Sequence, residues 1–252
     1  MEPQRRRTPV YDRIGRGYSL TRRPDSRIAR RILDALGDVG SVVNVGAGTG
    51  SYEPAGLQVV AVEPSQEMIA QRVAAAPVVR AVAESLPFPS RSFDAAMAVL
   101  TIHHWGDWRA GVSEMRRVAR SRIVLLTWDL DSGAGFWLLE YFPGILDLDR
   151  GRFPPFGDLL AATGGEPLSV PVPHDCSDGF LGAWWRRPSA YLDDTVRSAM
   201  SGFALLPDDD VARGLARLSA DTRSGEWERR FGALRDLEEL DLGYRLVVAD
   251  AT

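Results

Sequence analysis

Short apolar runs, separated by glycine, proline and charged residues, recur along this chain. Brief runs rich in valine and isoleucine are typical of strands that are buried on both faces of a parallel sheet. Helix-forming segments lie between most of them, and such alternation favours a parallel sheet with helices on both faces. The runs predict strands over residues 42–45, 59–62, 77–81, 93–99, 123–127, 168–172 and 243–249.

The helical segments show apolar residues spaced three and four apart. In the first, Asp25 is the expected N-cap, Ile28 and Ile32 lie on one face, and Gly37 follows the end. The fold class predicted by the whole pattern is α/β, with a doubly wound, mostly parallel, seven-stranded sheet. Further helices are predicted around Met68 and over residues 107–119, 156–163, 188–200, 208–218 and 227–234.

The chain length of 252 residues fits one large domain with an insertion. We expect an arm over 1–24, a cofactor-binding core over 25–130, and the rest of the sheet over 131–252. A helical insertion at about 175–225 interrupts that last part, and we expect it to cover the carboxyl edge of the sheet and to bind substrate.

The composition narrows the possible functions. All 30 basic residues are arginine, so no lysine is present to form a Schiff base or to bind ATP phosphates in a P-loop. The formal charge of −4 argues against binding nucleic acid through the overall field, and no apolar stretch is as long as a membrane helix. The single Cys176 permits no internal disulfide. We expect a cytoplasmic protein, monomeric or homodimeric, that binds neither nucleic acid nor membrane.

A glycine loop follows the first predicted strand. Residues 42–50 read Val-Val-Asn-Val-Gly-Ala-Gly-Thr-Gly, and glycine serves where the backbone is unusual or a ligand approaches closely. Glu63 ends the next apolar run, where its carboxylate can accept both hydroxyls of a ribose. The G-x-G-x-G spacing, with 13 residues from Gly50 to Glu63, differs from the dinucleotide fingerprint G-x-G-x-x-G, whose acid follows about 20 residues on. A plain glycine turn is the alternative.

Two motifs downstream make the pattern specific. Residues 83–94 read Ala-Glu-Ser-Leu-Pro-Phe-Pro-Ser-Arg-Ser-Phe-Asp, and residues 98–105 read Ala-Val-Leu-Thr-Ile-His-His-Trp. With the glycine loop and Glu63, they resemble the class I S-adenosyl-L-methionine (SAM)-dependent methyltransferases, in the small-molecule branch that includes the ubiquinone and menaquinone biosynthesis enzymes. The resemblance covers about residues 40–130. It implies a Rossmann-like methyltransferase fold, SAM as the cofactor and S-adenosyl-L-homocysteine (SAH) as its product.

The resemblance also implies the cofactor contacts. Glu63 would hold the ribose, and Ala83 and Glu84 would line the adenine. The family often has an acid where Asn44 stands, so we expect backbone carbonyl groups, such as that of Gly46, to bind the ammonium group. A lid over the cofactor is expected from the aromatic segment 11–18. The implied cofactor-binding residues are Tyr18, Asn44, Gly46, Ala47, Gly48, Glu63, Pro64, Ala83, Glu84 and Leu100.

Two histidines, His103 and His104, follow the predicted strand 93–99. This is the carboxyl end of the sheet, where ligands bind in such folds. A histidine can act as a base near neutral pH, and methyl transfer to a neutral hydroxyl or amine needs a base near its proton. We predict that one of them, preferably His103, is the catalytic base. The alternative is that the histidines only form the turn into the next helix, because members of the family carry His-His-Trp although their chemistry does not depend on it.

Aromatic residues and arginines concentrate beyond residue 130. Trp184 and Trp185 are adjacent and cannot share one helix face, so one is expected to line a cavity or an interface; core packing is the alternative. Arg186 can receive an anionic group or be solvated. The segment 173–179 contains a histidine and a cysteine but lacks zinc-ligand spacing, so we predict no metal and either a turn or part of the substrate pocket. The predicted substrate-binding residues are Trp137, His174, Trp184, Trp185 and Arg186.

Three functions remain open from these observations. The leading prediction is a SAM-dependent methyltransferase that acts on a small molecule, with O-methylation ahead of N- or C-methylation. The arginine-only, alanine-rich composition suggests a high-GC bacterium, where such enzymes often act in secondary metabolism. The alternative keeps the fold without the reaction: a SAM-binding, non-methylating catalyst such as a cyclase, or a regulatory subunit. A nicotinamide oxidoreductase is the third, and the glycine spacing disfavours it.

Overall fold

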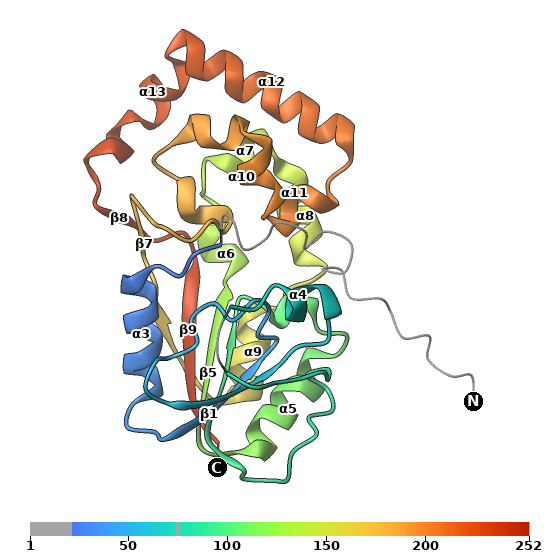
Figure 1. The fold of residues 1–252 in the computed structure, drawn as a ribbon. Coiled ribbons are helices and arrows are strands. Elements are labelled where there is room, and N and C mark those ends of the chain that lie inside the picture. Colours follow the sequence, from blue (N-terminus) through green and yellow to red (C-terminus); the bar gives the residue numbers. More distant parts are fainter. Residues whose placement is uncertain (1–21, 74–75, 252) are drawn as a thin grey trace.

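A computed structural model describes residues 22–73 and 76–251, and within these residues seven strands form the main sheet (Figure 1). The strand order is β3-β2-β1-β4-β5-β9-β6. Strands β1 to β5 pair in parallel, whereas β9 is antiparallel to both of its neighbours. The predicted fold class, a mostly parallel doubly wound sheet, is confirmed. The strands are β1 (Ser41–Val45), β2 (Gln58–Val62), β3 (Val78–Val79), β4 (Phe93–Val99), β5 (Ala119–Trp128), β6 (Glu166–Ser169) and β9 (Tyr244–Asp250).

One predicted strand, over 168–172, is divided in the structure. Its first part belongs to β6, at the edge of the main sheet, where Val170 still donates its N–H to the Tyr244 carbonyl at 2.9 Å. Pro171 has no N–H with which to continue this ladder. The chain then forms β7 (Val172–Pro173), which pairs antiparallel with β8 (Glu239–Leu240) in a separate two-stranded sheet.

Helices cover both faces of the main sheet. On one face lies α3 (Ser26–Leu36), with Asp25 as its N-cap and Gly37 after its end, as predicted. On the other lie α5 (Trp108–Val118) and α9 (Phe156–Thr163) (Figure 1). Strand residues alternate between the two resulting cores: Val42 packs with α3, and Val43 packs with α5. A short helix, α4 (Gln66–Ala70), follows β2.

A cap of helices lies over the carboxyl edge of the sheet (Figure 1). Two separate segments build it, so the predicted insertion over 175–225 is only part of it. The predicted helix over 188–200 is wrong, because the Asp193 carboxylate accepts the Thr195 N–H at 2.8 Å and starts a new helix there. The cap consists of α6 (Leu130–Gly133), α7 (Leu138–Tyr141), α8 (Pro143–Arg150), η2 (Leu181–Trp184), η3 (Pro188–Leu192), α10 (Asp194–Ser198), α11 (Ser201–Leu205), α12 (Asp208–Ser224), α13 (Glu226–Phe231) and η4 (Gly232–Asp236).

Aromatic rings form the core of the cap. The Trp137 ring meets the Trp227 ring at 5.3 Å and the Tyr191 ring at 5.6 Å, both edge to face, and Phe142 meets Phe203 at 4.8 Å. Such pairs add to the large apolar area that each ring buries. Of the helices that the structure describes, none is both long and apolar enough to cross a bilayer.

Candidate active site

The glycine loop after β1 turns against the ends of two neighbouring strands. The N–H groups of Gly46 and Ala47 donate to the Val62 carbonyl at 2.8 and 3.0 Å. Gly46 has a φ of 71°, and a side chain there would lie 2.2 Å from Thr101 Oγ1, just after β4. Both observations require glycine at this position. The loop thus lies between the carboxyl ends of β2 and β4, as its sequence predicts.

Glu63 lies beside this loop, directly after β2. It is 5% exposed, and its two carboxylate oxygens accept the N–H groups of Gly48 and Ser65, each at 2.8 Å. Ser65 in turn caps α4 by accepting the Met68 N–H. The carboxylate is therefore fixed between the glycine loop and the start of α4, and its contact with a ribose stays a prediction.

Asn44 belongs to a buried polar group that the sequence reasoning missed. Its Nδ2 donates to Glu53 at 3.2 Å, and Arg72 binds both Glu53 oxygens at 2.8 and 2.9 Å. Arg72 also donates to the Gly48 carbonyl at 3.2 Å. Asn44 Oδ1 is buried without a hydrogen-bond partner among the residues that the structure describes. Glu53 thus brings a carboxylate beside Asn44, and Arg72 neutralises it.

The remaining predicted cofactor residues surround the same edge. Ala83 is buried, and Glu84 accepts the N–H groups of Gly106 and Asp107 at 2.6 and 3.0 Å, ahead of α5. Leu100 has a φ of 50°, a sparsely populated conformation that concentrates at functional sites. The Pro64 carbonyl accepts from Arg80 at 3.1 Å. The adenine contacts stay predictions, and Tyr18 and the expected lid lie outside the described residues.

The two histidines occupy a short 3₁₀ helix, η1 (Ile102–His104), and differ in their surroundings. His103 stacks on the Phe153 ring, with centroids 4.2 Å apart and 13° between the planes. Its Nδ1 is buried and has no hydrogen-bond partner within the described part of the chain. His104 instead has its Nδ1 3.2 Å from Arg152 Nη2.

Both imidazoles are held neutral. Burial, with the neighbouring His104 and Arg152 adding to it, lowers the pKa of His103 well below its ordinary value. Burial and the Arg152 charge lower the pKa of His104 to about 3. A group with so low a pKa accepts a proton poorly near neutral pH, so this environment opposes the predicted role of catalytic base.

A cavity of about 60 Å³ lies between the end of β4 and the cap, and we call it the cap cavity. One water needs roughly 10–15 Å³, so the cavity has room for a few waters. Sequence reasoning found Leu100 and His103 on its wall but missed the residues from the cap. Of the residues that the structure describes, those on the wall are Arg22, Leu100, His103, Trp128, Asp149, Phe153, Phe180, Leu181, Ala199, Met200, Ser201, Gly202 and Tyr244.

The predicted substrate-binding tryptophans do not reach that wall. Trp185 is fully buried, and its indole N–H donates to the Val172 carbonyl at 3.0 Å. Trp137 is 2% exposed and donates to the Trp185 carbonyl at 2.7 Å. Trp184 lies under the Arg187 guanidinium, at 4.1 Å, and Arg186 donates to the Leu237 carbonyl at 3.1 Å. Core packing, the alternative left open for Trp184 and Trp185, describes Trp185, whereas Trp137 lines a separate cavity between α7 and η4.

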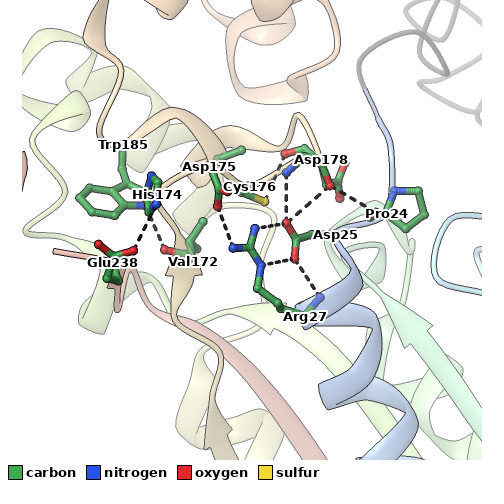
Figure 2. Close-up of polar contacts among 12 residues, drawn as sticks. Pro24, Asp25, Arg27, Val172, His174, Asp175, Cys176, Asp178, Trp185 and Glu238 are labelled. Carbon is green, nitrogen blue, oxygen red and sulfur yellow. Dashed lines mark hydrogen bonds and ion pairs between the residues drawn. The ribbon is translucent and has the colours of Figure 1, made fainter.

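His174 lies in a cluster of ion pairs that joins α3 to the loop after β7 (Figure 2). His174 Nε2 lies 3.3 Å from Glu238, and Arg27 binds both Asp25 and Asp175 at 2.7 Å. Burial raises the pKa of the Cys176 thiol to about 12, which leaves it protonated. Among the described residues, no group of three or more histidine, cysteine or acidic side chains could hold a metal ion.

A second buried network reaches the cap cavity. Arg22 binds both oxygens of Asp178 at 2.5 and 3.2 Å, and the Tyr52 hydroxyl donates to the same carboxylate at 2.8 Å. Asp178 is fully buried, and Arg22 lies on the wall of the cavity. Three distant segments meet here: the loop after the glycines, the residues before α3 and the entry to the cap. The spacing of Arg22, Tyr52 and Asp178 along the chain does not indicate that they lie together.

Comparison with known proteins gives this geometry a family context. A family model described as a methyltransferase domain matches residues 38–126, which include the glycine loop, Glu63 and both histidines. A crystal structure from Anabaena variabilis, assigned as a methyltransferase from an antibiotic biosynthesis pathway, is 38% identical with a TM-score of 0.86. That match covers 91% of this chain and 98% of the other.

Two further matches are more distant. The tRNA (carboxymethyluridine(34)-5-O)-methyltransferase of Schizosaccharomyces pombe is 26% identical over 130 residues, which are 48% of this chain and 57% of that protein. The cyclase SpnF, at 13% identity and a TM-score of 0.52, covers 96% of this chain and 94% of its own, and it shares the fold alone. The near-complete match to the Anabaena variabilis protein decides the family: this chain belongs to the class I SAM-dependent methyltransferases.

Proposed function

We propose that this enzyme methylates a hydroxyl group of a small, largely apolar molecule held in the cap cavity. The observation that carries the proposal is the position of that cavity. Its walls combine Leu100 and His103, from the carboxyl edge of the sheet, with aromatic and aliphatic side chains from the cap. Apolar walls with a few convergent polar groups are typical of sites for small molecules.

The residues at the glycine loop fit SAM. The buried Glu63 carboxylate suits vicinal ribose hydroxyls, because hydrogen bonds to an ionised acceptor are strong. The unpaired buried acceptor Asn44 Oδ1 suits an ammonium donor. When bound, SAM supplies an electrophilic methyl group. This chain's residues then have to orient the acceptor oxygen, exclude water and take its proton.

Two comparisons bear on the substrate class. The Anabaena variabilis protein, assigned to an antibiotic pathway, is similar along nearly its whole length, which favours a secondary metabolite. The tRNA methyltransferase of Schizosaccharomyces pombe is similar over only 57% of its length and 48% of this chain. The net charge of −4 and the aromatic side chains on the wall of the cap cavity favour a small molecule over a tRNA.

The test has two arms. Calorimetry with SAH is expected to show saturable binding, and incubation with SAM and a panel of phenols and aliphatic alcohols is expected to give products heavier by one methylene unit. The tRNA pool of a bacterial extract serves as the competing acceptor. Methylation of tRNA alone would overturn the small-molecule proposal. SAH binding with no methylated product from any acceptor would favour the non-methylating alternative.

A further inference from the structure

One carboxylate, that of Asp149, lies on the wall of the cap cavity. Asp149, near the end of α8, is 5% exposed, and its Oδ1 accepts from Arg152 at 3.0 Å. Its Oδ2 accepts no hydrogen bond from any residue that the structure describes. Two positions earlier on the same helix, Asp147 has a 76% exposed side chain and pairs with Arg150 at 3.6 Å. The two acids look alike in sequence, yet only Asp149 faces the cavity.

The charged and polar groups around Asp149 come from several elements. Arg152 pairs with Asp149 directly. Arg22, which is paired with Asp178, and the neutral Tyr244 of β9 lie on the same wall. His103 and His104, from η1, are held neutral. Burial raises the pKa of Asp149 to about 6 against the opposing effect of Arg152, so the carboxylate is ionised at neutral pH and can still take a proton.

We propose that Asp149 is the catalytic proton acceptor of this enzyme and selects neutral acceptors that bear a hydroxyl on an aromatic or apolar body. This inference rests on the proposed function. In the step, the acceptor O–H bond breaks and the proton moves to Asp149 Oδ2. The oxygen's electron pair forms the new bond to the methyl carbon while the carbon–sulfur bond breaks toward sulfur, giving the methyl ether and SAH. Water takes the proton from Asp149 after the product leaves.

The surroundings distinguish a hydroxyl from an ammonium group. Arg22 is paired with Asp178, and Arg152 is paired with Asp149. A cationic substrate would therefore have to compete with Arg152 for the Asp149 carboxylate or lie unpaired in a buried site, and burying an unpaired charge is costly. A neutral hydroxyl has no such penalty. The rings of Phe153, Phe180 and Trp128 on the wall suit a flat apolar body. His103 lies on this wall too, but its low pKa makes it the weaker base.

The test uses the full chain with three variants: Asp149→Asn, Asp149→Glu and the exposed control Asp147→Asn. Methyl transfer from SAM to the phenol panel is measured from pH 5 to pH 9. SAH affinity is measured by calorimetry, and binding of 4-nitrophenol to the SAH complex is followed by its absorbance. We expect Asp149→Asn to lower kcat by about 100-fold or more, as loss of a general base does. The Glu variant should recover part of the rate, and Asp147→Asn should match the wild type. SAH affinity should stay within twofold in all three.

The pH dependence adds a readout that a structural role would not move. The wild-type kcat/KM should fall as the pH drops below about 6, where Asp149 becomes protonated, and the residual rate of Asp149→Asn should lack this acid limb. An Asp149→Asn rate above half of wild type, or an unchanged acid limb in that variant, overturns the inference.

Two further outcomes separate this inference from the proposed function. Two results would reject the acceptor class while the family assignment stands. One is normal SAH binding without methyl transfer to any phenol. The other is 4-nitrophenol binding that is equal in wild type and Asp149→Asn. Failure to bind SAH at all rejects the proposed function itself. If Asp149→Asn does not fold, the Asp149→Glu rate and the wild-type pH profile carry the test, and wild-type activity that stays level down to pH 5 is contradictory.

Discussion

The carboxyl edge of the sheet and the cap above it place their functional groups in different ways. At the edge, Glu63 is held by the N–H group of Ser65, two residues further on, and by that of Gly48 in the glycine loop of the same motif. In the cap cavity, Asp149 and His103 line the same wall although they come from separate segments of the chain. The edge is built from backbone turns that a short motif specifies. The cavity depends on packing between distant elements. Two aspartates of the same helix therefore differ: Asp149 is buried at the cavity, whereas Asp147 is exposed.

The largest expected effect tests whether the cap tryptophans are structural. Replacing the fully buried Trp185 with alanine should cost about 3–5 kcal/mol of unfolding free energy, because it leaves a cavity in the aromatic core and removes the hydrogen bond to the Val172 carbonyl. Thermal unfolding should show a fall in Tm of roughly 6–20 °C. The neighbouring Trp184→Ala, at a half-buried position, is the matched control and should cost less. Equal losses in the two variants would mean that Trp185 does not anchor the cap core.

A second variant tests the edge of the sheet. Glu63→Ala should weaken SAH binding about 10- to 100-fold, because charge-assisted hydrogen bonds to the ribose are lost together with the support of the loop. Calorimetry on the folded variant measures this. Glu67→Ala, on the adjacent α4, keeps the loop contacts and should bind SAH as the wild type does. Unchanged affinity in Glu63→Ala would remove the ribose assignment.

The ion pairs that join α3 to the loop after β7 predict a pH effect on stability. Burial alone would raise the pKa of Asp25, but hydrogen bonds from Arg27 and Ser177 overcome it and lower the pKa from 3.8 to about 2. A folded-state pKa below the ordinary value stabilises the fold above about pH 4, and that stability is lost as the pH falls toward 2.

Asp25→Asn should therefore cost about 1–2 kcal/mol at pH 7 and reduce the slope of stability between pH 4 and pH 2. Chemical denaturation at each pH measures both quantities. Asp34→Asn, at the exposed end of the same helix, has only a surface pair with Arg30 at 3.4 Å and should change little. The same slope in Asp25→Asn and wild type would contradict the assignment.

The smallest expected effect concerns His103. If Asp149 takes the substrate proton, His103→Gln should lower kcat by less than tenfold, since the imidazole then contributes only to the wall of the cavity. Initial rates at saturating SAM measure this, and the acid limb of the pH profile should persist in the variant. A loss of about 100-fold, or disappearance of that limb, would restore the histidine as the base.

The accuracy of the sequence-based predictions follows the same division between edge and cap. Strand β4 was predicted with its observed bounds, and the ends of α3 were found because Asp25 and Gly37 are local signals. The helix over 188–200 was predicted as continuous, since its periodicity did not reveal that Asp193 caps a new helix. Trp185 was predicted to bind substrate, whereas the structure places it in the aromatic core. Its hydrogen bonds with Val172 and Trp137 join separate segments of the chain, so its sequence neighbours did not reveal this position.

The sequence by itself determined the sheet, the glycine loop and the placement of Glu63, because hydrophobic period, glycine dihedrals and helix caps act over a few residues. Only the tertiary structure decided that Asp149 is buried at the cavity while Asp147 is solvated, that Arg22 and Tyr52 share Asp178, and which aromatic rings face the cavity. Burial, and with it the pKa of a carboxylate, depends on which distant segments pack together, and no local pattern in the chain records that choice.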